Sequence, residues 1–216
     1  MNVDAHQSEA EAIAFYLPQY HPIPENDEAW GAGFTEWTNV KKATPLFEGH
    51  EQPKEPSELG YYSLENPDVQ VRQAELAASH GIGTFAYWYY WMGGGKKLLE
   101  KPLEAMVQNS RIHIDFCLAW ANESWTGVWH GNPDHIIADQ HYENGEDIDL
   151  HANNLARLMK DSRYKRINGK SLFLIYKPMQ LPSGYLKKLR KGLRERGLEI
   201  FAVAISNKSF DWKAHG

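Results

Sequence analysis

One short stretch of the chain concentrates residue types that could do chemistry. "WANESWTGVW" (120–129) places three tryptophans, one side-chain amide and one carboxylate in ten positions, directly after an apolar run. Flat rings around a carboxylate suit a packed turn, a stacking platform for nucleic-acid bases, or a loop of a sugar-binding site. Between dry aromatic walls Glu123 would serve as a general acid, whereas in an open loop it is a solvated side chain, and both interpretations stay open.

Similar side chains recur where other apolar runs end. In parallel α/β folds the carboxyl ends of the strands meet at one mouth, so we expect these side chains to converge there. These side chains are rings, amides, an imidazole and carboxylates, and the set carries little positive charge. A phosphate site would need Lys, Arg or a glycine-rich loop, so the set matches sugar hydroxyls better than a phosphate. The candidate substrate-binding residues are Tyr16, Gln19, His21, Tyr89, Trp91, Trp120, Asn122, Trp125 and Tyr176, with Glu123 as substrate contact first and candidate catalyst second.

Several of these candidates have a purely structural alternative. Tyr16 lies within an apolar run and is equally compatible with a core position, and His21 precedes a proline, as a turn residue does. Glu36 and Trp37, in "GFTEWTNV", repeat the Glu–Trp pairing and are added as candidates. The tryptophans at 88 and 91 are three residues apart, so in a strand they point to opposite faces, and one of them would line an interior.

The elements that must position these residues are strands and helices in alternation. Apolar runs at 13–18, 84–91, 114–120, 171–176 and 199–206 alternate with helix-periodic segments that include 147–161 and 183–197. This alternation predicts a parallel sheet. Closure of an eight-stranded barrel takes about 250 residues. We therefore expect an α/β fold of the (β/α)8 TIM-barrel type with only about the first five βα units present, as one partial domain over 1–216. An open doubly wound sheet is the alternative, but its G-x-G-x-x-G turn is missing after the first run.

The first connection, 19–66, is unusually long for a compact domain. Loops of this length are functional or disordered. Disorder fits poorly, because Trp30, Phe34, Trp37, Leu46 and Phe47 would leave much apolar surface in water. We expect an ordered wall or lid over a site.

Composition excludes several classes of protein. A net charge of −5 argues against a nucleic-acid partner, and the basic run "KKLRKGLRER" (187–196) is interpreted as the solvated face of a helix. The single Cys117 excludes an internal disulfide framework. Neither a signal peptide nor a run of about 18 apolar residues is seen, which predicts a cytoplasmic chain without a membrane span. No metal-ligand spacing and no G-x-S-x-G motif occurs, so no cofactor and no metal are expected.

Longer strings of the sequence resemble a known family. "AFYLPQYHPIPENDEAWGAGFTEWTNVKKATPLFEGH", "QAELAASHGIGTFAYWYYW", "KPLEAMV" and "FCLAWANESWT" closely resemble the WbsX-like proteins. These bacterial proteins occur with surface-polysaccharide biosynthesis and are commonly labelled glycosyltransferases. They are similar to family-99 glycoside hydrolases, endo-mannosidases and endo-mannanases with a (β/α)8 barrel. The resemblance runs from about 13 to about 205 and implies a glycan groove at the carboxyl ends of the strands.

The resemblance also implies what this chain lacks. In the family, the catalytic carboxylates lie in an Asn-Glu-Trp-x-Glu-Gly motif on a late strand, and no such string occurs here. The chain is therefore expected to bind an oligosaccharide or polysaccharide but to be inactive as it stands, with a complementary C-terminal fragment as a further partner. The alternatives are a glycosyltransferase of lipopolysaccharide or O-antigen biosynthesis and a non-catalytic carbohydrate-binding module.

Overall fold

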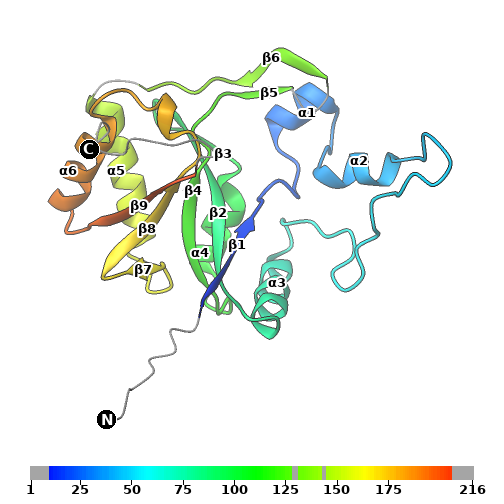
Figure 1. Cartoon of the computed structure of the whole chain (residues 1–216), viewed down its shortest axis with the longest axis horizontal. Helices are drawn as coiled ribbons and strands as arrows, with labels where there is room; N and C mark the ends of the chain where they lie inside the picture. Colours follow the sequence, from blue (N-terminus) through cyan, green and yellow to red (C-terminus); the bar gives the residue numbers. More distant parts are fainter. Residues whose placement is uncertain (1–9, 128–130, 143–144, 206–216) are drawn as a thin grey trace, which may run out of the picture.

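The core of the protein is a five-stranded parallel sheet. The computed structural model describes residues 10–127, 131–142 and 145–205. Its parallel strands are β1 (Ala12–Tyr16), β2 (Ile82–Gly93), β4 (Asp115–Trp120), β8 (Lys170–Ile175) and β9 (Ile200–Ala204), and they lie side by side in the order in which they occur in the sequence (Figure 1). This order is that of a (β/α) barrel, whereas a doubly wound sheet reverses its order part-way. The predicted alternation of five strands is confirmed.

One main helix follows each of the first four parallel strands. These helices are α3 (Pro67–Ser79), α4 (Glu100–Gln108), α5 (Gly145–Met159) and α6 (Tyr185–Glu195). The start of α3 is fixed by Pro67 in its first turn and by Asn66, whose side-chain oxygen accepts a 3.0 Å hydrogen bond from the Asp68 amide. Helices α5 and α6 cross closely, because a Cβ on Gly192 would lie 3.1 Å from the Cβ of Ala152.

Most of the remaining elements lie at the carboxyl end of the sheet, whereas β7 (Arg166–Ile167) pairs with the start of β8 at the other end. Two short helices, α1 (Pro24–Trp30) and α2 (Glu36–Lys42), give order to the long first connection, as the sequence predicted. A hairpin pairs β5 (Trp125–Gly127) with β6 (Asn132–Ala138), and β3 (Lys96–Leu98) folds back on β2. A short 3-10 helix, η2 (Pro178–Gln180), follows β8.

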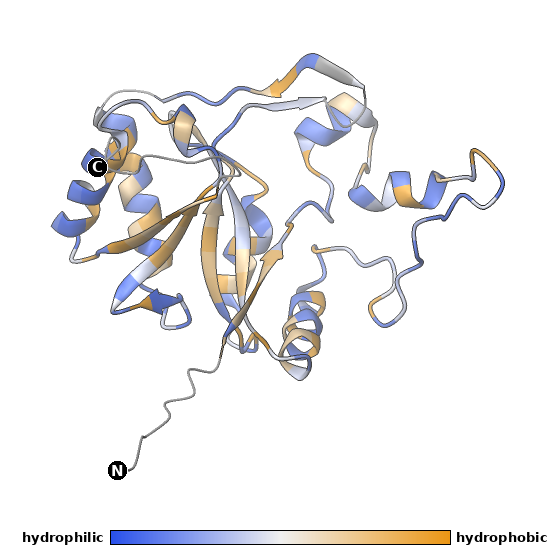
Figure 2. Cartoon of the chain, viewed as in Figure 1, coloured by the Kyte–Doolittle hydropathy of each residue, from blue (hydrophilic) through white to orange (hydrophobic). Residues whose placement is uncertain are grey.

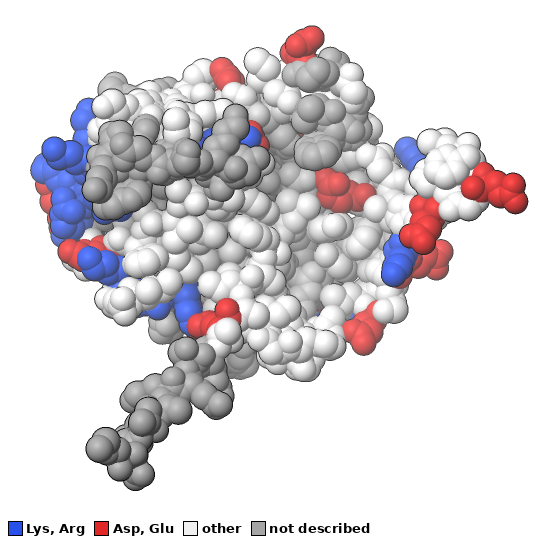
Figure 3. Space-filling model, in the orientation of Figure 1, with Lys and Arg blue, Asp and Glu red and all other residues white. Residues whose placement is uncertain are grey.

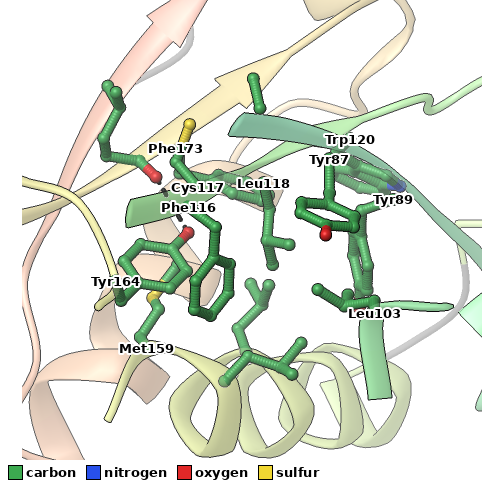
Figure 4. Packing of buried hydrophobic residues seen from close by; sticks show 14 of the residues in the cluster. Tyr87, Tyr89, Leu103, Phe116, Cys117, Leu118, Trp120, Met159, Tyr164 and Phe173 are labelled. Atoms are coloured by element: carbon green, nitrogen blue, oxygen red, sulfur yellow. Dashed lines mark hydrogen bonds between the residues drawn. The ribbon is translucent and has the colours of Figure 1, made fainter. Parts of the chain in front are cut away.

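The hydrophobic core fills the space between the sheet and its helices. Neighbouring strands are in register at Tyr87–Leu118 and Leu118–Phe173, so their side chains form one continuous row on this face. All three side chains are at most 1% exposed, and Trp120 beside them is 0% exposed. Figure 4 shows these rings packed over a helix, with the Tyr164 hydroxyl donating a 2.9 Å hydrogen bond to the Leu172 carbonyl.

The opposite face of the sheet leaves apolar side chains open to solvent. Ile13 and Phe15 of β1 are 39% and 54% exposed, and Phe201 of β9 is 38% exposed. Figure 2 shows that the strands are the most hydrophobic part of the ribbon. Helices cover only one face of these strands. These exposed side chains belong to the two outer strands, whereas Ala86, Cys117 and Ala119 between them are fully buried. The face therefore resembles the interior of a barrel that is open at its two edges.

None of the helices in the described part of the chain could cross a membrane. The longest of them, α5, has 15 residues and is amphipathic, and none of the described helices combines the length and apolar character of a bilayer crossing.

Candidate functional site

A cleft of about 420 Å³ opens at the carboxyl end of the sheet. Its floor is formed by the ends of the strands, one wall by α1, α2 and the turn between them, and another wall by the hairpin of β5 and β6. The aromatic lining residues are Trp30, Phe34, Trp88, Tyr90, Trp125 and Tyr176, and the polar ones are Gln19, Asn26, Glu36, Asn39, Glu123, Ser124 and Thr126. Leu17, Ala121 and Ile137 complete the lining. We refer to this set of residues as the cleft.

The floor of the cleft is aromatic because β2 turns its even-numbered side chains inward. Trp88 packs edge-on against Tyr176, the residue that follows β8, with ring centroids 5.3 Å apart at 82°. On its other side it stacks on Phe15 at 5.0 Å and 13°. These contacts hold the Trp88 ring in place, and a fixed, partly exposed indole is a flat apolar platform.

The Tyr90 hydroxyl is a polar group on this floor. It accepts a hydrogen bond from the Gln19 side-chain amide at 3.4 Å. Burial raises the pKa of the Tyr90 phenol well above its usual range, and the nearby carboxylates of Glu36 and Glu123 raise it further. The phenol is therefore neutral and offers a hydroxyl, and both carboxylates of the cleft lie close enough to influence it.

Glu123 stands in the cleft as an open, paired carboxylate. It comes three residues after the end of β4, its side chain is 41% exposed, and its Oε2 lies 3.5 Å from the Lys177 ammonium. Lys177 in turn lies over the Tyr176 ring, 4.6 Å from its centroid. This solvent-accessible environment differs from the dry aromatic walls that a general acid requires.

Asn122 fixes the geometry of the cleft instead of facing it. Its Oδ1 accepts from the Lys177 amide at 2.8 Å, and its Nδ2 donates to the Lys177 carbonyl and to the Tyr142 hydroxyl, each at 2.9 Å. The Tyr142 hydroxyl donates back to the Asn122 carbonyl at 2.9 Å. The residue is fully buried, and its amide joins the end of β4 to the end of β8. It therefore sets where Glu123 stands relative to Tyr176, and the sequence-based role of binding a hydroxyl is replaced by a positioning role.

Four of the predicted aromatic residues lie on the opposite face of the sheet, outside the cleft. Tyr16 donates a 2.7 Å hydrogen bond to Gln73 of α3 and stacks on Tyr87, and the Tyr89 hydroxyl accepts from Asn154 of α5 at 2.9 Å. The indoles of Trp91 and Trp120 donate to Asp147 of α5 and to the Trp91 carbonyl.

The reason for this placement is strand alternation. Within β2 the side chains at 85, 87, 89 and 91 face the helices, whereas those at 84, 86, 88 and 90 face inward. Both sets are aromatic because both faces are apolar. The sequence predicted that positions 88 and 91 point to opposite faces, and the structure places Trp88 in the cleft and Trp91 against the helices.

Two further candidates support the long first connection and do not line the cleft. The Trp37 indole donates a 2.8 Å hydrogen bond to the Tyr62 carbonyl, and its ring packs on Tyr20 at 4.6 Å. His21 is 1% exposed, and this burial lowers its pKa. Of the predicted residues, Gln19, Glu36, Glu123, Trp125 and Tyr176 are brought together in the cleft.

Several lining residues were missed by the sequence analysis. Trp88 and Tyr90 belong to the predicted aromatic strand 84–91, but they were not among the candidates for substrate binding. Asn26, Trp30, Phe34 and Asn39 come from the long connection, where Glu36 and Asn39 stand three residues apart on one face of α2. That spacing was the local signal for Asn39, whereas Trp30 and Phe34 had been predicted only as part of an ordered wall or lid. The end of "WANESWTGVW", Val128 and Trp129, lies outside the described residues.

The residues of the cleft suit a polar organic ligand more than an ion. Among the described residues no three His, Cys, Asp or Glu side chains come together as metal ligands would. None of the described residues that line the cleft is a Lys or an Arg, and Lys177 at its margin is paired with Glu123. Anionic phosphates therefore find no basic cradle here.

Comparison with known proteins agrees with this geometry. The family model described as glycosyltransferase WbsX matches residues 12–215. The chain belongs to the WbsX family. The protein WxcX from two strains of Xanthomonas campestris pv. campestris is 46% identical over 173 residues, which are 80% of this chain and 25% of WxcX. The chain thus spans about a quarter of the length of the curated relatives that it matches.

Two solved structures share the fold of this chain. A family-99 endo-alpha-mannosidase from Bacteroides thetaiotaomicron, in complex with BIS-TRIS-propane, superposes with a TM-score of 0.54 at 15% identity. The match covers 89% of this chain and 51% of that one. A glycoside hydrolase-like protein gives 0.53 at 13% identity, covering 90% and 51%. At such low identity these neighbours establish the fold alone: an α/β chain that corresponds to about half of a TIM-barrel protein.

Proposed function

We propose that the cleft binds an uncharged saccharide, as the first half of a glycan-active barrel. The observation that carries this proposal is the lining that the structure describes: six aromatic rings, amides, hydroxyls and two carboxylates, with no Lys or Arg among these described residues. Aromatic faces pack on the C–H faces of pyranose rings, while amides and carboxylates bond sugar hydroxyls. A volume of about 420 Å³ lies within the range of small-molecule sites.

The roles of individual residues follow from their positions. Trp88 and Tyr176 provide the stacking floor, and the amide of Gln19 and the hydroxyl of Tyr90 form a hydrogen-bonded pair beside it. Glu36 and Glu123 accept hydrogen bonds from hydroxyl groups, and both influence the same Tyr90 phenol. We infer that this chain binds without turnover, because Glu123 is exposed and paired with a lysine, and the family's late carboxylate motif is absent from the sequence.

Calorimetric titration of the chain with α-linked mannotetraose, with other neutral α-linked oligosaccharides and with a nucleotide sugar tests this proposal. We expect saturable binding of at least one neutral oligosaccharide, loss of that binding in Trp88→Ala, and no reaction products by chromatography. Phe47→Ala is the matched control, because Phe47 is an exposed ring, 65% accessible, away from the cleft. Binding of the nucleotide sugar with no response to oligosaccharides would instead support a glycosyltransferase that uses a site elsewhere.

We further propose that additional βα units cover the open face of the sheet. A groove of about 550 Å³ runs beside β1, between it and α3, and is lined by Tyr16, Leu76, Ala77 and Phe85 among others. The groove is lined mainly by apolar side chains, and Ile13 and Phe15 beside it are exposed. A further strand could therefore pair with β1 and a further helix could pack beside α3. Chain 1–216 alone should self-associate in analytical ultracentrifugation, and Phe15→Ser should weaken this association. A strictly monomeric wild-type chain would contradict the proposal.

A further inference from the structure

Helix α6 presents a row of basic side chains on its outward face. The helix contains five cations and one carboxylate. Lys187, Lys188, Lys191 and Arg194 are exposed, while Leu189 on the opposite side is fully buried. Positions 187, 191 and 194 fall on one face at helical spacing. In the space-filling view Lys and Arg side chains gather along the edge that α6 forms, at the left of Figure 3.

This basic face, Lys187, Lys188, Lys191 and Arg194, contrasts with the charge of the whole chain. The protein has a net charge of −5, so the remainder is distinctly acidic. Neighbouring carboxylates neutralise the basic face in part. Glu195 pairs with Lys191 at 2.9 Å, and these side chains are 56% and 73% exposed. Glu199 lies near Arg194, and Asp149 of α5, which pairs with Arg196, lines one groove with Lys188 and Lys191. Exposed pairs of this kind are weak and exchange readily with other charged partners. The basic face is therefore available to an anionic surface.

We propose that this basic face binds the surface of a membrane that contains anionic lipids. Three of its four cations are lysines, point charges on flexible stems that suit a diffuse layer of headgroups. The only aromatic ring of α6, Tyr185, is 3% exposed, so the helix offers no ring for stacking on nucleic-acid bases. Because the apolar side of α6 is already covered by the protein, the helix lies on the surface electrostatically and does not insert.

The position of α6 relates this surface to the cleft. The helix follows β8, and η2 and a short turn lead from the end of that strand to Tyr185. Tyr176 and Lys177, at the end of β8, form one margin of the cleft, and in a βα unit the helix starts on the side where the strand ends. Lys187 and Lys188 thus lie toward the end of the molecule where the cleft opens. If the proposed function holds, membrane binding brings the cleft close to saccharides that are attached to lipids.

Flotation with lipid vesicles tests the membrane proposal without any saccharide. The wild-type chain is mixed with vesicles of equal parts phosphatidylglycerol and phosphatidylcholine, or with phosphatidylcholine alone, at low and at high salt. Each cation near an anionic surface strengthens partitioning about fivefold. The triple variant Lys187→Gln, Lys188→Gln, Lys191→Gln should therefore partition about a hundredfold more weakly. High salt should release the wild type, because surface charges are then screened.

A matched variant controls for net charge. Lys42, Lys54 and Lys96 are exposed lysines away from α6, and their replacement by Gln changes the net charge by the same amount. This control variant should float as the wild type does. The proposal is overturned if the wild type fails to float with anionic vesicles or if both triple variants lose vesicle binding equally. It is also overturned if, in a parallel binding assay, the wild type binds a single-stranded RNA but not the vesicles. Unchanged titration with oligosaccharide in the α6 variant shows that the cleft is intact, so the two proposals fail separately.

Discussion

A buried histidine makes the stability of this protein sensitive to acid. His151 of α5 is 0% exposed, and its ring stacks on Trp91 with centroids 4.8 Å apart at 5°. The Trp120 ring meets it edge-on at 4.7 Å, and His151 Nδ1 shares a 3.1 Å hydrogen bond with the Tyr185 hydroxyl. Removal from water disfavours the charged imidazolium and lowers the pKa of His151 to about 3.

The magnitude follows from proton linkage. In the unfolded chain the histidine has a pKa of about 6.5, so below that pH the unfolded state takes up a proton that the folded state resists. The stabilisation is fully present above pH 6.5 and is lost progressively as the pH falls toward 3. Between about pH 7 and pH 5 this single group should cost about 2 kcal/mol of the free energy of unfolding.

Urea denaturation of the wild type and of His151→Phe at these two pH values measures the effect. A phenyl ring retains the stacking on Trp91 and does not titrate, so the variant should lose about 2 kcal/mol less than the wild type over the same interval. His113→Gln is the control, because His113 is exposed, and it should keep the wild-type pH dependence. Equal acid sensitivity of His151→Phe and wild type would refute the assignment, since another group would then carry the linkage.

Two further substitutions test how the fold is held together. Arg163 donates hydrogen bonds of 3.0–3.1 Å to four carbonyls at and beyond the end of α4. Arg163→Lys should therefore lower the free energy of unfolding, measured in urea, by about 2–3 kcal/mol. Arg111→Lys is the control and should be nearly neutral, because Arg111 is exposed. Gly93 has φ +95°, and a Cβ there would lie 2.4 Å from the His141 carbonyl oxygen. Gly93→Ala should therefore be more destabilising, in the same assay, than Gly49→Ala, where φ is +78° but no atom lies within 4 Å; equal effects would contradict the close approach.

The fold was accessible to sequence reasoning because its signals are local. Continuous apolar runs such as 171–176 form strands that are covered on at least one face, and the helix over 67–79 has a proline start and an asparagine cap. The hairpin of β5 and β6 was not predicted, because its strands are short and irregular in register, with polar residues such as Asp134 breaking any alternation.

The site was accessible only in part. Sequence alternation shows that Trp88 and Trp91 face opposite ways, but which face is the interior depends on where the helices pack. Asn122 was correctly placed at the end of a strand, yet its hydrogen bonds to Lys177 depend on the neighbouring strand, 55 residues later. The wall formed by α1 and α2 could be predicted to be ordered, whereas the identity of its inward side chains follows from tertiary packing.

The most direct test of the central claim is fluorine NMR of the chain labelled with 5-fluorotryptophan, titrated with the oligosaccharide that binds in calorimetry. Single Trp→Phe variants assign the resonances. We predict that the signals of Trp88 and Trp125, which line the cleft, shift on saturation, whereas those of Trp91 and Trp120, which are buried against the helices, stay in place. Shifts confined to Trp91 and Trp120, or no shift at Trp88 when the ligand is bound, would contradict the assignment of the cleft as the saccharide site.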